Sequence, residues 1–320
     1  MMRIKNTIKS ILLLLHRHRK SHPDIYIFSL PRAGTTLLTE ILNSDANSKT
    51  ASESLALNRD NIRVLRKYFE EDFLAERYVD ISMENLQKIF SYYGDLSEGK
   101  SWNSYYWSDF FTKNHSFSTS RTIFKTHKIT YHFREMMDHF KKDIGIYLLR
   151  HPVSHSLSRV RKGWTTYIDL YSEAEKIKEL LPTAAKDMIT LVSDSGSDLD
   201  KFIVSWCLEN YLFIRSYQDK TLPDNLYPVF YEDLVLNPES CIRDICNKAG
   251  LQYNSKMLSI VDVPSSGIVH SSDLTEEQIR AGNKNYLVNR WKDELGRDAE
   301  DQLKKILSAF NITIYPETKT

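Results

Sequence analysis

The chain has 320 residues, of which 41% are hydrophobic and 27% charged, so it can bury a large core and is not a disordered chain. Its formal net charge is only +1, which gives no indication of a nucleic-acid or other polyanionic partner. The three cysteines, Cys207, Cys241 and Cys246, are too few for a disulfide framework and indicate a reducing compartment, which we take to be the cytoplasm.

A basic N-terminal segment, residues 1–22, precedes the main domain, which we expect over residues 23–320. Its apolar run Ile11–Leu15 is too short to cross a bilayer, and no cleavage site follows it. We therefore expect no stable membrane anchor; a basic helix that touches a membrane surface is the alternative to packing on the body. The histidines of this segment lie among lysines and arginines that would repel a metal ion, so they predict no metal site: His16, His18 and His22.

The apolar run Ile25–Phe28 predicts a buried parallel strand, followed by a turn at Pro31–Gly34 and by a helical pattern. A strand, a tight turn and a helix start together present backbone N–H groups and a positive helix end to an anion. Arg32 adds a full positive charge, and Thr35 and Thr36 add hydroxyl donors. The sequence therefore predicts a site for a phosphate-like group; a tight turn without a ligand is the alternative.

This loop differs from the nucleotide loop G-x-x-x-x-G-K-[ST]. No glycine lies five residues before Gly34, no lysine follows it, and the cation, Arg32, precedes it instead. The sequence also lacks a G-x-G-x-x-G pattern. These differences argue against an ATP-dependent kinase and against a dinucleotide-binding protein.

A second strand is predicted at Thr122–His127, where Lys125 and His127 lie two residues apart and so on the same side. An ammonium and an imidazole side by side are unusual for a core strand and indicate a reactive site. An edge strand that exposes both side chains to solvent is the alternative.

The apolar run Ile144–Leu149 predicts a third parallel strand that ends at Arg150. Open α/β sheets bind their ligands at the carboxyl ends of the strands. Pro152 suits the first turn of the next helix, and Ser158 follows Arg150 by about two helical turns. An arginine at the strand end and a hydroxyl on the helix are therefore placed to hold a second phosphate.

Four segments, in chain order, resemble the sulfotransferases that use 3′-phosphoadenosine 5′-phosphosulfate (PAPS). They resemble, respectively, the 5′-phosphosulfate loop, the K-T-H strand of the cytosolic branch, the 3′-phosphate motif, and the Y-E-D-L strand and turn: Ser29–Leu37, Lys125–His127, Tyr147–Ser158 and Val229–Pro238. Each segment alone is a modest signal, and all four in order make a strong one.

The resemblance implies an α/β fold with a P-loop-like central parallel β-sheet flanked by helices, in a single domain. Helical and loop insertions at approximately residues 55–120 and 163–200 are expected to form the acceptor pocket. The implied reaction is metal-independent, in-line transfer of the sulfuryl group from PAPS to a hydroxyl or amine of a small molecule, as in natural-product tailoring. A P-loop-type nucleoside or metabolite kinase and a non-catalytic nucleotide-binding protein are the alternatives.

The resemblance also implies contacts to the bound nucleotide. The 5′ phosphate is expected to lie in a cradle formed by Arg32, Ala33, Gly34, Thr35 and Thr36. Arg150 and Ser158 are expected to hold the 3′ phosphate, and Tyr231 to lie beside the adenine. The R-K-G loop of the cytosolic branch is missing, so we expect Arg280, Lys284 or Arg290 in its place. The dimer motif of that branch is also absent, because Gly296-Arg297 stands where Thr-Val is expected; another oligomer remains open.

Four residues are predicted to carry the chemistry. Arg32 and Lys125 would stabilise the bridging oxygen and the departing phosphate electrostatically. His127 occupies the K-T-H position, where the resemblance implies the general base. Glu53 is its rival, because the tyrosyl-protein branch carries a catalytic glutamate at the same interval after its arginine-bearing loop. The chain thus combines features of the two branches, and we favour His127 while leaving Glu53 open.

Overall fold

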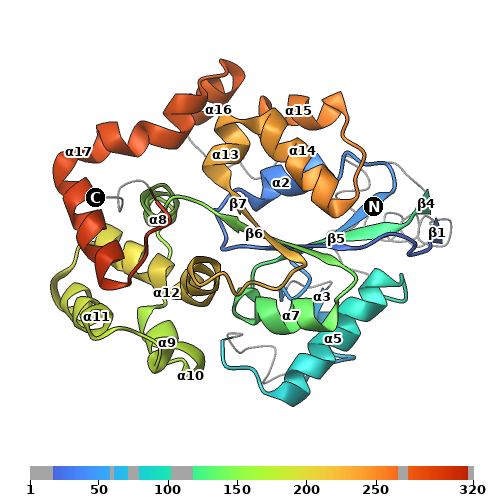
Figure 1. The fold of residues 1–320 in the computed structure, drawn as a ribbon, viewed down its shortest axis with the longest axis horizontal. Coiled ribbons are helices and arrows are strands. Elements are labelled where there is room, and N and C mark those ends of the chain that lie inside the picture. Colours follow the sequence, from blue (N-terminus) through green and yellow to red (C-terminus); the bar gives the residue numbers. More distant parts are fainter. Residues whose placement is uncertain (1–16, 58–60, 71–78, 102–117, 266–272, 316–320) are drawn as a thin grey trace, which may run out of the picture.

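A five-stranded, all-parallel sheet forms the centre of the molecule, as predicted (Figure 1). The structure is a computed structural model that describes residues 17–57, 61–70, 79–101, 118–265 and 273–315. The strands are arranged in the order β3-β5-β2-β6-β7, and their bounds are as follows: β2, Ile25–Phe28; β3, Ser48–Ser52; β5, Arg121–Thr126; β6, Ile144–Leu149; and β7, Leu226–Phe230. Phe28 at the end of β2 pairs with Thr126 and Tyr147, so the neighbouring strands end at a common edge.

The alternating side chains of β2 supply two cores. Ile25 and Ile27 belong to one apolar cluster, together with residues of three helices: α2, Thr35–Leu42; α14, Pro238–Ala249; and α15, Ser255–Val261. Tyr26 and Phe28 belong to the other cluster, with residues of α5, Met83–Ser97, and α7, Phe133–His139. Because successive strand residues point to opposite faces, one apolar run buries both faces of the sheet, and Figure 1 shows these helices above and below it.

A second group of helices lies beyond the carboxyl ends of the strands, at the left in Figure 1. It comprises α8, Pro152–Val160; α9, Ile168–Ser172; α10, Glu175–Lys178; α11, Thr183–Ser195; α12, Asp198–Gln218; and α17, Lys284–Ala309. Three further helices are α3, Asn61–Leu65; α13, Tyr231–Leu236; and α16, Asp273–Arg280. A short pair, β1 (Arg17–His18) and β4 (Ser118–Thr119), and the 3-10 turn η1 (Thr130–His132) complete the described elements.

The Y-E-D-L segment begins in a strand as predicted, at Val229 and Phe230, but Tyr231–Leu236 form a helix where a turn was expected. The strand β7 ends at Phe230, and Tyr231 begins α13. Glu232 and Asp233 lie in the first turn of that helix, where negative side chains interact favourably with the positive helix end. The change of structure puts Tyr231 directly at the carboxyl edge of the sheet.

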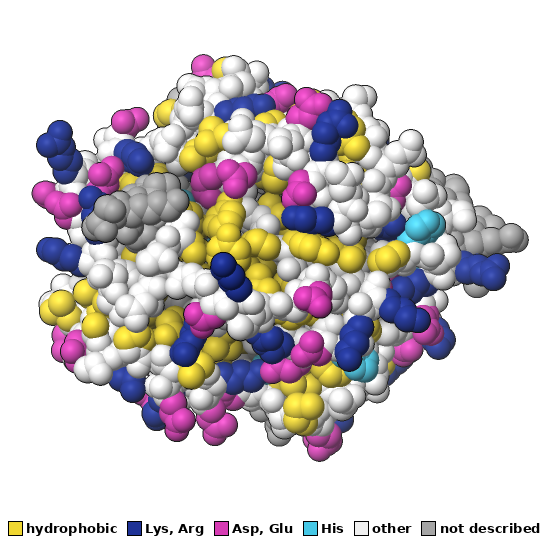
Figure 2. All heavy atoms as spheres, in the orientation of Figure 1, with side chains coloured by type: hydrophobic (Ala, Val, Ile, Leu, Met, Phe, Trp, Pro, Cys, Tyr) yellow, Lys and Arg dark blue, Asp and Glu magenta, His cyan; other side chains and the backbone are white. Residues whose placement is uncertain are grey.

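Within the described residues, no helix has both the length and the apolar character needed to cross a membrane. Most of the predicted basic segment, residues 1–16, lies outside the described part of the chain. Acidic and basic side chains are interspersed over the face drawn in Figure 2, in agreement with the small net charge.

Candidate functional site

The carboxyl edge of the sheet borders a cavity of about 310 Å³, which is lined by residues at or after the ends of all five strands. Glu53 follows β3, Lys125 is the second-last residue of β5, and Arg32 lies in the loop after β2. Arg150 follows β6 directly, and Tyr231 follows β7. Residues far apart in the sequence therefore meet here because parallel strands end at one edge.

The loop between β2 and α2 has an unusual backbone. Arg32 has φ 78° and Gly34 has φ 99°, and the left-handed region suits glycine but costs an arginine on the order of 1 kcal/mol. Gly34 is the N-cap of α2, and among the described residues no side chain caps this helix start. The N–H groups at the start of α2 are thus available to an anion, and Thr35 and Thr36 line the same cavity.

Two arginines meet beside this loop. Arg150 Nη1 donates to the backbone carbonyl of Arg32 at 3.1 Å, and Arg32 Nε donates to Ser158 Oγ at 3.0 Å. Burial and then the nearby charge of Arg150 lower the pKa of Arg32. Arg150 Nε is buried and has no hydrogen-bond partner among the described residues. Two adjacent guanidinium groups and an unused donor make this part of the cavity suitable for an anion.

Lys125 and Glu53 form an ion pair inside the cavity. Lys125 Nζ donates to Glu53 Oε1 at 3.1 Å and to Thr36 Oγ1 at 3.4 Å. The Glu53 N–H also donates to the Lys125 carbonyl at 3.0 Å, and Glu53 itself has φ 48°. The ammonium of Lys125 therefore lies between the start of α2 and a carboxylate.

His127 is placed to accept a proton. Its Nδ1 lies 2.9 Å from the carbonyl oxygen of Ser29, and because a carbonyl only accepts, Nδ1 carries the hydrogen. The lone pair is then on Nε2, which lies 4.0 Å from Glu53 Oε1. Burial, followed by the charge of Lys125, lowers the pKa of His127 to about 4, so the ring is neutral at pH 7.

The other predicted residues differ in how they relate to the cavity. Lys284 lines it and forms an ion pair with Asp262 at 3.3 Å. Ala33 is buried in the loop, and Ser158 contacts Arg32, but neither is among the described lining residues. Arg280 is exposed and is likewise not among them.

Arg290 is half-buried, whereas Arg280 is exposed. Burial lowers the pKa of Arg290 first, and the charges of Arg161 and Arg150 lower it further. Of the arginines we considered for the missing R-K-G loop, Arg290 thus lies within electrostatic reach of Arg150.

Sequence reasoning missed three residues that shape the site. His155 Nε2 donates to the Pro31 carbonyl at 2.9 Å and so supports the loop from α8. Trp164 and Asp262 line the cavity. His155 could have been found from its spacing, since it lies about one helical turn before Ser158. Trp164 and Asp262 belong to other parts of the chain, and no local pattern marks them.

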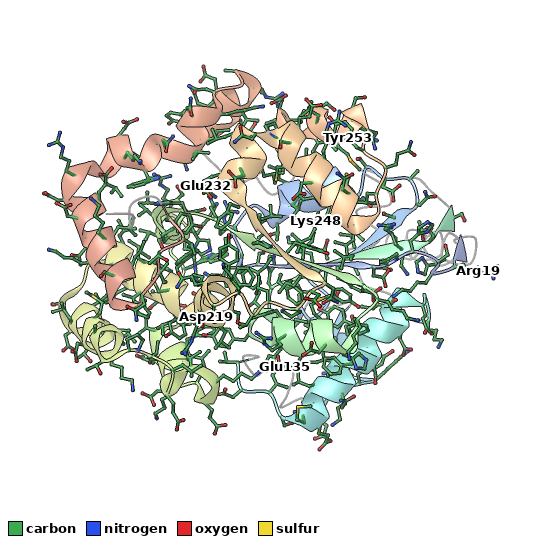
Figure 3. All side chains as sticks on the ribbon, viewed as in Figure 1. Arg19, Glu135, Asp219, Glu232, Lys248 and Tyr253 are labelled. Atoms are coloured by element: carbon green, nitrogen blue, oxygen red, sulfur yellow. The ribbon has the colours of Figure 1, made fainter. Side chains whose placement is uncertain are left out.

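Glu232, labelled in Figure 3, supports the start of α8. One carboxylate oxygen, Oε1, accepts the His151 N–H at 2.9 Å. Burial raises the pKa of Glu232. This contact joins α13 to the end of β6 and so keeps Tyr231 and Arg150 close together.

Comparison with known proteins gives one family and several distant structures. A family model described as "Sulfotransferase family" matches residues 23–255. No curated protein matches the chain significantly. The chain is similar to the sulfotransferase domain from the curacin biosynthetic pathway, at 17% identity and TM-score 0.47, over 92% of this chain and 100% of that one. It is also similar to the sulfotransferase domain from the Synechococcus PCC 7002 olefin synthase, at 17% identity and TM-score 0.46, over 93% and 98%.

A third solved structure is mouse sulfotransferase SULT7A1 complexed with PAP, at 15% identity and TM-score 0.37, over 83% of this chain and 70% of that one. Because the family model covers most of the chain, including every strand of the central sheet, the chain belongs to the sulfotransferase family.

Proposed function

We propose that this protein transfers the sulfuryl group of PAPS to a hydroxyl or amine of a small molecule, without a metal ion. One observation carries the proposal: two groups of anion-binding donors line the same cavity as an ammonium and a neutral imidazole. The first group is the start of α2 with Thr35, Thr36 and Arg32, and the second is Arg150. A nucleotide with phosphates at both its 5′ and 3′ positions needs two such groups.

The shape of the site supports a close approach of phosphate to backbone. Among the described residues no side chain caps the start of α2 at Gly34, so the N–H groups there are left for a ligand. Arg150 retains a buried Nε–H without a partner among the described residues. We assign the 5′ phosphate to the α2 start and the 3′ phosphate to Arg150, supported by Ser158.

The proposed reaction balances as a single displacement. The acceptor oxygen or nitrogen attacks sulfur, the bond between sulfur and the bridging oxygen breaks, and the electron pair remains on the departing phosphate. Lys125 and Arg32 stabilise the charge that develops there, each worth on the order of 3 kcal/mol of barrier. The acceptor's proton passes to His127 Nε2, which holds the lone pair.

Glu53 has a supporting role in this proposal. Its carboxylate lies 4.0 Å from His127 Nε2, so it stabilises the imidazolium that forms when the ring takes the proton. Glu53 is itself held by Lys125. Direct proton abstraction by Glu53 remains the alternative assignment.

We propose a small-molecule alcohol, phenol or amine as the acceptor, and the cytoplasm as the location. All three cysteines, Cys207, Cys241 and Cys246, lie in the described part of the chain and are free thiols, which supports a reducing compartment.

The test is transfer of radiolabelled sulfate from PAPS to a panel of alcohols, phenols and amines, with EDTA present. Thermal unfolding is measured in parallel with adenosine 3′,5′-bisphosphate and with ATP plus magnesium. We expect labelled product and stabilisation by the bisphosphate. Stabilisation by ATP and magnesium alone, with no label transferred, would reject the proposal in favour of a kinase.

A further inference from the structure

We propose that Tyr231 is a positioning residue that couples the two anion-binding groups of the cavity through the face and edge of its ring. This inference rests on the proposed function and assigns to Tyr231 a different role from that of an aromatic contact to the adenine. Tyr231 lines the cavity and lies where β7 passes into α13.

The first contact of Tyr231 is with Arg150. The guanidinium carbon of Arg150 lies 4.5 Å from the centre of the Tyr231 ring, which is within the range of a cation–π interaction. The same guanidinium donates through Nη1 to the Arg32 carbonyl. The ring thus supports the guanidinium group from one side, and the guanidinium group in turn holds the backbone of the loop.

The second contact of Tyr231 is with Gly34. A Cβ atom placed on Gly34 would lie 2.4 Å from Tyr231 Cδ2 and 2.7 Å from Cε2. Real Cβ atoms essentially never approach another atom so closely, so the ring occupies the space that any other residue at position 34 would need. The loop residue that opens α2 is therefore held directly against Tyr231.

Tyr231, Arg150 and the loop between β2 and α2 all contact one another. Tyr231 packs against Gly34 and Arg150, and Arg150 donates a hydrogen bond to the Arg32 carbonyl in the same loop. A phosphate that binds at either end meets a group whose position depends on the same ring. Tyr231 consequently contributes to affinity through Arg150, and removing the ring should matter little once Arg150 is gone.

The experiment is a double-mutant cycle on nucleotide affinity, measured by isothermal titration calorimetry with adenosine 3′,5′-bisphosphate and with adenosine 5′-monophosphate. The variants are Tyr231→Leu, Arg150→Met and the double variant. We expect Tyr231→Leu to weaken bisphosphate binding about tenfold, as for loss of a partly buried cation–π contact. In the Arg150→Met background the same change should cost less than about twofold.

Tyr231→Phe keeps the ring and should retain the affinity of the wild-type protein for the bisphosphate, because the hydroxyl has no part in either contact. The matched control is Tyr253→Leu, which removes another tyrosine ring under an arginine, since Arg243 Cζ lies 3.9 Å from that ring centre. Tyr253, labelled in Figure 3, is not among the described residues that line the cavity, so its loss should leave nucleotide affinity unchanged.

An equal loss for the bisphosphate and the monophosphate that persists in the Arg150→Met background would overturn the inference and assign the ring to the adenine. If Tyr231→Leu does not fold, as judged by thermal unfolding, Tyr231→Met completes the same cycle. If the wild-type protein itself does not prefer the bisphosphate to the monophosphate, the proposed function fails instead, so the two failures are distinguishable.

Discussion

Lys125 Nζ lies 3.1 Å from Glu53 Oε1, so a cation expected to hold the donor nucleotide already has a carboxylate partner. The side chain of Lys125 is 12% exposed and that of Glu53 is 36% exposed. An anionic group that enters the cavity must therefore compete with Glu53 for the ammonium. This competition separates the two roles open to Glu53, because an ion-pair partner opposes nucleotide binding whereas a general base is needed only for the chemical step.

Replacing Glu53 by glutamine should separate nucleotide affinity from turnover. Glu53→Gln leaves Lys125 without its charged partner, so we expect adenosine 3′,5′-bisphosphate to bind a few-fold more tightly. Because the imidazolium loses its nearby carboxylate, kcat should fall by about tenfold or less. The measurements are calorimetric affinity and steady-state kinetics on the same preparation. A fall in kcat of a thousandfold would make Glu53 the general base.

Replacing His127 by asparagine should have the larger effect on turnover. His127→Asn removes the Nε2 lone pair and retains a side chain that can donate to the Ser29 carbonyl, so we expect kcat to fall about 100-fold or more, as for loss of a general base. The KM for PAPS should change little. His139→Asn is the matched control, since His139 is exposed on α7 and stacks on Phe90 rather than lining the cavity. Near-normal turnover in His127→Asn would contradict the assignment.

The sheet and its binding edge could be predicted because local patterns of apolar and charged residues indicate them. The runs Ile25–Phe28 and Ile144–Leu149 are apolar throughout, as strands buried on both faces must be, and both form strands at the predicted residues. Arg150 follows the second run directly, and Arg32 lies in the turn after the first, so the sequence also indicated residues that meet at the edge. Lys125 was selected from another predicted strand, on which it lies two residues before His127. Arg32, Lys125 and Arg150 all line the cavity.

The remainder depends on contacts between distant segments. Arg32 donates to Ser158, 126 positions further along the chain, and no local pattern of either segment indicates this bond. The Tyr231 ring fills the space beside Gly34, which requires the tertiary packing of α13 on the loop. Lys284 lines the cavity because α17 begins there, whereas Arg280, four residues earlier, is exposed on α16. Spacing alone could not rank these two cations.

The low pKa of His127 makes the stability of the protein depend on pH. In the unfolded chain a histidine binds a proton near pH 6.5, whereas the folded protein keeps His127 neutral down to about pH 4. Between these values the unfolded state binds more protons, so the free energy of unfolding falls as the pH is lowered. The full difference for this group corresponds to about 3 kcal/mol, which is lost progressively from pH 6.5 to pH 4.

Denaturant unfolding at several pH values tests this expectation. His132, whose pKa burial also lowers to about 4, contributes to the same window, so the wild-type protein alone does not isolate His127. The comparison is with His127→Asn, whose free energy of unfolding should fall less steeply between pH 6.5 and pH 4. Parallel pH profiles for the two proteins would mean that His127 is protonated in the folded state at an ordinary pKa.

Replacing Gly34 by alanine should disable the loop more than it unfolds the protein. At φ 99° an alanine is strained, and its Cβ would overlap the Tyr231 ring at 2.4 Å, so we expect a loss of stability on the order of 1–3 kcal/mol. Either the ring or the loop must shift, which disturbs the contact between Tyr231 and Arg150, so affinity for adenosine 3′,5′-bisphosphate should fall about tenfold. Gly94→Ala is the matched control. Gly94 lies within α5, and no described neighbour lies within 4 Å of its added Cβ, so this change should raise stability by about 0.5–1 kcal/mol and leave the affinity unchanged. Thermal unfolding and calorimetry on both variants decide the matter: equal affinities would show that Gly34 is not needed for the anion to reach the start of α2.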